Sequence, residues 1–113
     1  MELTGITRGE FEKSGLSFDK YPYNPEGSGA LPPLGKVEIS KPEDLGDVIV
    51  VHMGQPVKIT RTLHEDGGVS YHGDPNWVCS GYTKKYKPRE EPQDPKKILD
   101  YLVGSLISLA NSD

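Results

Sequence analysis

Apolar side chains gather in two stretches of this chain, residues 47–63 and residues 98–110. The first stretch is rich in β-branched residues, which favour strands, and the second repeats its apolar positions with the period of an α-helix. A chain of 113 residues is near the size at which burial of apolar surface only just outweighs chain entropy, so a second core is not available. The distribution therefore predicts one domain whose core comes mainly from these two stretches.

The first stretch predicts two strands. Residues 47–53 are a β-branched run bounded by glycines, which is typical of a strand buried on both faces. Gly54, Gln55 and Pro56 predict a turn. Residues 57–63 then alternate apolar with polar side chains, which predicts a strand that covers a core with one face.

More strands are expected further along the chain. The sequence EDGG at residues 65–68 favours a hairpin turn, so residues 69–72 should return antiparallel. Residues 76–83 predict another strand, interrupted or bulged at Gly81. Three or four short antiparallel strands indicate a mainly β (α+β) fold, either a small antiparallel barrel or a curled sheet.

The second apolar stretch predicts one C-terminal amphipathic helix. Asp94 is a suitable N-cap, Pro95 suits the first helical position, and Asn111 can end the helix. The apolar stripe spans about 140°, whereas a surface helix needs only ~100° to cover a core. Either the sheet uses the entire stripe, or a partner chain contacts part of it. The side chains expected to contact a partner are Leu99, Leu102, Val103 and Leu106.

The chain divides into a loop-rich N-terminal arm at residues 1–46, an antiparallel β core at residues 47–89, and a linker with the helix at residues 90–113. Two Ser/Thr-x-x-Glu spacings in the arm, TRGE from residue 7 and SKPE from residue 40, predict helices of a turn or two. Proline fixes φ and removes a hydrogen-bond donor, so the stretch between them should run extended.

The extended arm is a candidate binding segment because preformed extended chains dock into grooves at low entropic cost. It contains aromatic and proline-rich sequence, which would lie on its own core, on another protein or on a second copy of the chain. The arm side chains expected to contact a partner are Tyr21, Tyr23, Leu31 and Leu34.

All three histidines and the only cysteine lie within 28 residues of one another. They are His52, His64, His72 and Cys79. Three imidazoles and a thiolate would satisfy tetrahedral zinc, but their spacing lacks the short pairs of a zinc knuckle. A hairpin turn of two or four residues would put His64 and His72 on opposite faces of the sheet, and only an odd loop or a bulge would bring them to one face. The alternative to a metal site is a set of exposed or hydrogen-bonded histidines.

The same window could hold a thiol nucleophile. Cys79 would need a base such as His64 or His72 within hydrogen-bond reach and a third group to orient that base. No local motif of a thiol enzyme surrounds it, and a small buried thiol is the ordinary alternative.

One basic segment carries interleaved tyrosines. Cations bind phosphates and aromatic faces stack on bases, so this segment could form a nucleic-acid edge on a small barrel. Its members are Lys84, Lys85, Tyr86, Lys87 and Arg89. Glu90 and Glu91 follow at once and weaken the positive field, and the alternative is a solvated strand end.

Several classes of function are excluded. A net charge of −4 opposes binding nucleic acid over the whole surface, and no glycine-rich phosphate loop follows a strand. The N-terminus lacks the pattern of a signal peptide, and no apolar run approaches the ~18 residues of a membrane span. We expect a soluble, intracellular chain that does not enter a membrane and needs no cofactor.

These observations favour a non-enzymatic protein-binding or assembly module that uses the C-terminal helix and the arm. Its partner would be another protein or copies of the same chain, as in the subunits of larger assemblies, viral particles among them. The first alternative is a small barrel that binds nucleic acid through residues 84–89. The second is a metal or thiol site in the window from His52 to Cys79.

Overall fold

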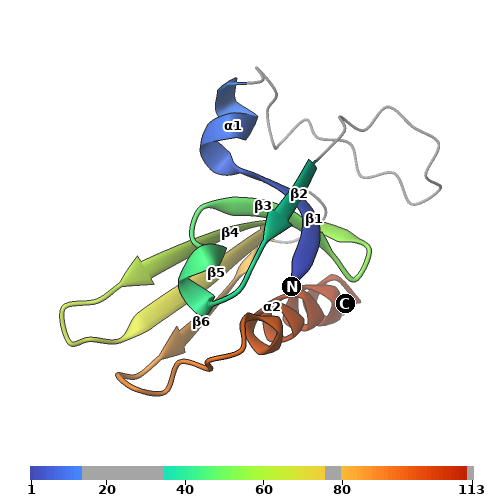
Figure 1. The fold of residues 1–113 in the computed structure, drawn as a ribbon. Helices are drawn as coiled ribbons and strands as arrows, with labels where there is room; N and C mark the ends of the chain where they lie inside the picture. The colour runs from blue at the N-terminus through green and yellow to red at the C-terminus, as the bar shows by residue number, and fades with distance from the viewer. Residues whose placement is uncertain (14–34, 76–79, 112–113) are drawn as a thin grey trace.

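The computed structural model describes residues 1–13, 35–75 and 80–111. In this part of the chain six antiparallel strands form one sheet, and a long helix lies against one of its faces (Figure 1). The strands are β1 (Glu2–Thr7), β2 (Gly35–Glu38), β3 (Val48–His52), β4 (Gln55–Leu63), β5 (Val69–Pro75) and β6 (Tyr82–Tyr86). The helices are α1 (Arg8–Lys13), the 3-10 turn η2 (Pro42–Leu45) and α2 (Pro95–Asn111).

The spatial order of the strands is β2-β1-β3-β4-β5-β6, and the described strands do not close into a barrel. The predicted mainly β (α+β) fold with one C-terminal amphipathic helix is confirmed in its curled-sheet form. The described strands do not form the other predicted fold, a small antiparallel barrel. Because the sheet is open, β2 and β6 are its edge strands.

Strand β3 is buried on both faces, as its β-branched run predicts. Val48 and Val50 pair with residues of β4 and join the core that α2 covers, which we call the α2 face of the sheet. Ile49 points to the opposite face, where it packs with Phe11 of α1. Alternation along one strand therefore supplies both layers with apolar side chains.

Helix α2 begins and ends as predicted. The Lys96 backbone N–H donates to Asp94 Oδ1 at 2.9 Å, which caps the first turn. The chain's own sheet buries most of the stripe, while Leu109 near the C-terminal end stays 43% exposed. The four side chains expected to contact a partner, Leu99, Leu102, Val103 and Leu106, all have no exposed surface. They form the core of this chain and offer no free surface to a partner.

Two strands lie within the segment predicted to be a loop-rich arm. β1 is not an edge strand: it lies between β2 and β3. A glycine inside a short strand weakens the sequence signal, yet a Cβ at Gly5 would lie 2.6 Å from the carbonyl oxygen of Ile49. Glycine is needed here because β1 and β3 approach so closely. The arm residues Tyr21, Tyr23, Leu31 and Leu34 lie outside the described residues.

The turn after β3 differs from the predicted one. Met53 and Gly54 form a two-residue loop between the pair His52 and Gln55, and both have positive φ, 53° and 76°. This is the geometry of a type I′ hairpin turn, which matches the twist of paired strands. Gln55 and Pro56 therefore belong to β4 rather than to the turn.

The two predicted short helices form. In α1 the Glu10 N–H donates to Thr7 Oγ1 at 3.3 Å. In η2 the capping carboxylate is that of Asp44 and not of the predicted Glu43, because it accepts the N–H groups of both Ser40 and Lys41. Within the described residues, no helix has the length and apolarity needed to cross a membrane.

Candidate binding edge at strand β6

Strand β6 runs further than the strand predicted at residues 76–83, of which residues 76–79 lie outside the described residues. It starts after Gly81, whose φ is +100°, and continues to Tyr86, so Lys84 and Lys85 belong to a strand and not to a linker. It pairs with β5 on one side only, and within residues 1–13, 35–75 and 80–111 its outer edge meets no other strand. An edge strand presents backbone N–H and C=O groups that another chain can pair with.

The side chains of β6 alternate between two environments. Tyr82, Lys84 and Tyr86 lie on the α2 face, because cross-strand partners share a face and Lys84 pairs with the core residue Tyr71. Thr83 and Lys85 lie on the opposite face and are exposed. The strand is thus held to the domain by one set of side chains and presents the other set to solvent.

Lys84 sits between two aromatic rings. Its Nζ lies 5.3 Å from the ring centroid of Tyr86 and 5.3 Å from that of Tyr101 on α2. The Tyr82 and Tyr101 rings lie 6.0 Å apart, and their hydroxyl oxygens are 3.2 Å apart. This hydrogen bond is the main cause of the raised pKa of Tyr82. We call Tyr82, Lys84, Tyr86 and Tyr101 the tyrosine–lysine cluster.

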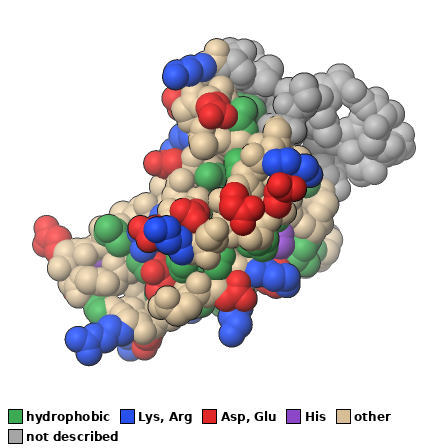
Figure 2. Space-filling view, in the orientation of Figure 1, with side chains coloured by type: hydrophobic (Ala, Val, Ile, Leu, Met, Phe, Trp, Pro, Cys, Tyr) green, Lys and Arg blue, Asp and Glu red, His purple; other side chains and the backbone are tan. Residues whose placement is uncertain are grey.

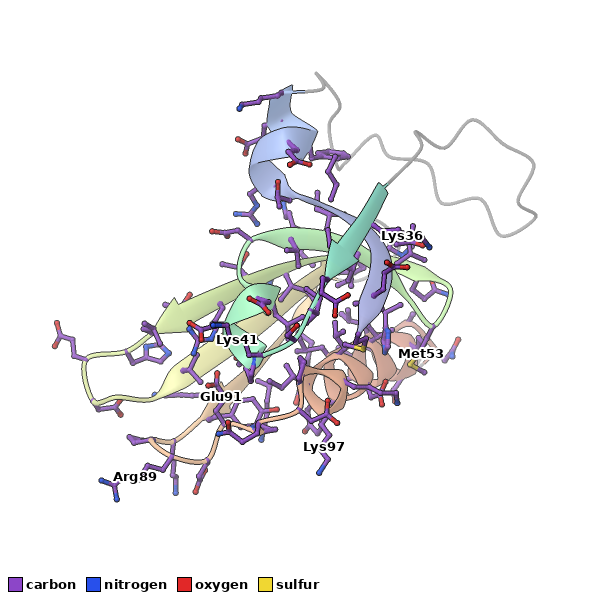
Figure 3. The ribbon with its side chains drawn as sticks, viewed as in Figure 1. Lys36, Lys41, Met53, Arg89, Glu91 and Lys97 are labelled. Carbon is purple, nitrogen blue, oxygen red and sulfur yellow. The ribbon has the colours of Figure 1, made fainter. Side chains whose placement is uncertain are left out.

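The basic segment at β6 holds cations without acidic partners. In the described part of the chain, Lys84, Lys85, Lys87 and Arg89 form no ion pair. Arg89 lies in the connection after β6 and points away from the body of the domain (Figure 3). On the face shown in Figure 2, acidic and basic side chains are otherwise interspersed. The positive field is therefore local to β6 and its C-terminal end.

A polar network fixes the chain just beyond this segment. Arg61 of β4 forms a bidentate ion pair with Glu91, with Nη2–Oε distances of 3.1 and 3.2 Å, and its Nε donates to the Tyr71 hydroxyl at 2.9 Å. The Tyr71 hydroxyl in turn donates to Glu91. Burial, followed by this hydrogen bond, raises the pKa of Tyr71. The network attaches the β6–α2 connection to the sheet.

Sequence reasoning did not find this network, although one signal was present. Arg61 continues the apolar positions Val57 and Ile59 of an alternating strand, so its charge falls on the α2 face and needs a partner. The partner, Glu91, is thirty residues away in sequence. Its side chain and that of Arg61 are only 23% and 18% exposed.

The histidines do not converge. His52 lies on the α2 face, where its Nε2 is 2.7 Å from Asp100 Oδ1 of α2, and Asp100 Oδ2 accepts from Lys96 Nζ at 2.8 Å. The hydrogen bond from Lys96, and then that from His52, lowers the pKa of Asp100. His64 and His72 lie on the opposite face.

The loop between β4 and β5 is odd in length, because Leu63 pairs with Val69. This satisfies the condition for His64 and His72 to share a face. Four positions still separate them along the strand, which corresponds to about 13 Å. His64 Nε2 lies 2.5 Å from Ser70 Oγ and His72 Nδ1 lies 2.7 Å from Thr83 Oγ1.

Neither a metal centre nor a thiol site is assembled by the described residues. No group of three metal-binding side chains occurs among them, and Cys79 lies outside them. The pair His64–Ser70 resembles a base and a nucleophile, but in the described structure no carboxylate holds the other ring nitrogen of His64. A serine nucleophile needs such an orienting group.

Compared with known proteins, the chain matches no family model, no curated protein and no solved structure. Function is therefore inferred from the chain's own residues.

Proposed function

We propose that this chain is a non-enzymatic protein-binding module that takes an extended segment of a partner protein onto the outer edge of β6. The observation that carries this proposal is the outer edge of β6, which pairs with no other strand among the described residues and belongs to a strand whose own side chains are anchored in the domain. Backbone hydrogen bonds supply affinity in such strand addition, and alternate side chains supply specificity.

The choice of β6 over the other edge strand rests on its length and charge. β2 has four residues and carries Lys36 and Glu38, of which Lys36 donates to Thr4 Oγ1 of β1. β6 has five residues, followed by further cations that have no acidic partner in the described structure. Short edges are poor templates for strand pairing, so β6 is the better one.

Selection of peptides from a random library on the full chain tests this proposal. We expect peptides that bind in an extended form. For a selected peptide, methylation of the backbone nitrogen at alternate residues should abolish binding for one alternate set and spare it for the other, because only one set faces β6. Failure to select any peptide, or equal tolerance of both methylated sets, would contradict strand addition.

A further inference from the structure

We infer that the segment recognised by β6 is an amphipathic acidic strand, with apolar residues beside the α2 face and carboxylates beside the opposite face. This inference rests on the proposed function and specifies the chemistry of the partner. The chemistry of the partner is inferred from two observations. The first is the face of the sheet on which each β6 side chain lies, and the second is the set of cations that already have an acidic partner.

Register fixes what an added strand would contact. Residues that lie opposite each other on paired strands share a face, so the new strand would place alternate side chains beside Tyr82, Lys84 and Tyr86, and the others beside Thr83 and Lys85. The tyrosine rings pack against the core, and the Lys84 ammonium lies over the rings of Tyr86 and Tyr101, so this side still offers ring surface to apolar neighbours. The opposite side carries the exposed ammonium of Lys85, which favours a carboxylate.

Charge complementarity favours an acid over a neutral polar residue. Five cations elsewhere in the described structure are paired with acids, Arg8, Lys41, Lys58, Arg61 and Lys96, whereas Lys13, Lys36 and Lys97 are single unpaired cations and form no cluster. The four cations of the basic segment have no such pair: Glu90, which directly follows the segment, forms no ion pair among the described residues, and Glu91 is already bound to Arg61. An acidic partner would meet Lys85 at the strand and Lys87 and Arg89 beyond it.

The tyrosine–lysine cluster favours a peptide over a nucleic acid. Single strands bind on aromatic faces that are free to stack with bases. In this cluster Lys84 Nζ lies over both Tyr86 and Tyr101 at 5.3 Å, so these faces already hold a cation. Phosphates could still reach Lys85, Lys87 and Arg89, which makes an oligonucleotide a necessary competitor in the test.

A second copy of the chain is a less suitable occupant. Pairing β6 with the β6 of another copy would bring two basic strands together at the spacing of neighbouring strands. Like charges directly opposite each other in a sheet are destabilising. An acidic strand is free of this repulsion.

Three short synthetic peptides of one alternating design test the inference, with Glu, Gln or Lys at every second position and Val between. Binding to the full chain is measured by fluorescence anisotropy at low and moderate salt, and backbone hydrogen exchange is measured at β6. We expect the Glu peptide to bind about tenfold more tightly than the Gln peptide, with a preference that falls as salt rises. It should also slow the exchange of β6 amides.

Paired variants locate the effect. Lys85→Glu should lower the affinity for the Glu peptide about tenfold and raise the affinity for the Lys peptide, because the substitution reverses the one exposed charge on the strand. Lys97→Glu makes the same charge change on α2, where the side chain is exposed and points away from the domain (Figure 3), and should leave binding unchanged.

The outcomes separate the two proposals. Equal binding of the Glu and Gln peptides, with protection of β6 amides by both, overturns the acidic partner and retains strand addition. Binding without protection of β6 overturns both. Tighter binding of a single-stranded oligonucleotide that is lost in Lys85→Glu and leaves β6 amides unprotected also overturns both, and replaces them with nucleic-acid binding.

Discussion

The turn between β3 and β4 places a methionine in a backbone conformation that side chains other than Asn, Asp and Gly rarely adopt. Met53 has a φ of 53°, and its side chain is 56% exposed. The left-handed region costs most residues about 1–2 kcal/mol, because the Cβ approaches the following carbonyl. Because more than half of Met53 is exposed, burial of its apolar surface offsets little of this cost.

Met53→Asn should therefore stabilise the fold. Asparagine followed by Gly54 is the preferred pair for a type I′ turn, so we expect about 0.5–1 kcal/mol of added stability, or ~3–5 °C in Tm. Thermal unfolding followed by circular dichroism measures it. Met53→Leu, which keeps the same backbone cost, is the matched control and should unfold near the original Tm. A decrease in Tm for the asparagine variant would show that the Met53 side chain contributes more than its exposure implies.

At the scale of elements, His52 and Asp100 connect the end of β3 to α2, the helix that packs on the same face of the sheet. Lys96, one turn earlier on the helix, donates to the other oxygen of Asp100. The pKa of Asp100 in the folded chain is lowered from its ordinary value of 3.8, mainly by Lys96 and then by His52. A carboxylate whose pKa is lower when folded stabilises the fold above its unfolded pKa, and loses that contribution as pH falls through the folded pKa.

Asp100→Asn should consequently lower Tm at neutral pH and converge with the original chain below pH 3.8. Because Asp100 is 43% exposed, solvent screens the pair, and we expect a loss of only ~1–3 °C. Thermal melts across this pH range are the measurement. Glu12→Gln serves as the control, since it removes one negative charge from exposed α1 and breaks no hydrogen bond or ion pair of the described structure. A deficit for Asp100→Asn that persists unchanged at low pH would rule out an ionic contribution.

Elements whose signal is local could be predicted from sequence. The stripe of α2 and the β-branched run of β3 specify their own structure and their buried faces, and Asp94 and Asn111 mark the helix ends as expected. β1 and β2 could not be predicted in this way. They are short, Gly5 interrupts β1, and pairs such as Leu3 with Val37 join residues that are far apart in the chain.

The amino-acid composition of the candidate site could be predicted from the sequence, but the position of the site in the fold could not. Residues 84–89 read as basic and aromatic from sequence alone. The segment lies on an edge strand, with Lys84 between two tyrosine rings and Lys85 on the other face. These positions depend on the register between β5 and β6 and on Tyr101 of α2, which comes later in the chain. The helix stripe was visible as well, but its width could not decide whether the sheet or a partner buries it.

At the scale of the whole molecule, an open sheet must avoid pairing edge to edge with other copies. Lys84 can prevent such pairing at β6, because it places a cation on the α2 face of this edge strand, between the rings of Tyr82 and Tyr86. A second β6 added at this edge would place its own Lys84 on the same face, so that two ammonium groups would lie close together. Lys85 lies on the opposite face, where a charge stays in water whether or not another strand is added.

Lys84→Val should therefore cause self-association, and Lys85→Val should not, although both variants lose one charge and gain a β-branched residue. We expect sedimentation velocity to give a coefficient that rises with concentration for Lys84→Val, while the original chain and Lys85→Val sediment as monomers. The associated variant should also lose affinity for the acidic peptide, because the same edge is occupied. Equal behaviour of the two variants would mean that total charge, and not the face on which Lys84 lies, keeps this edge free for a partner.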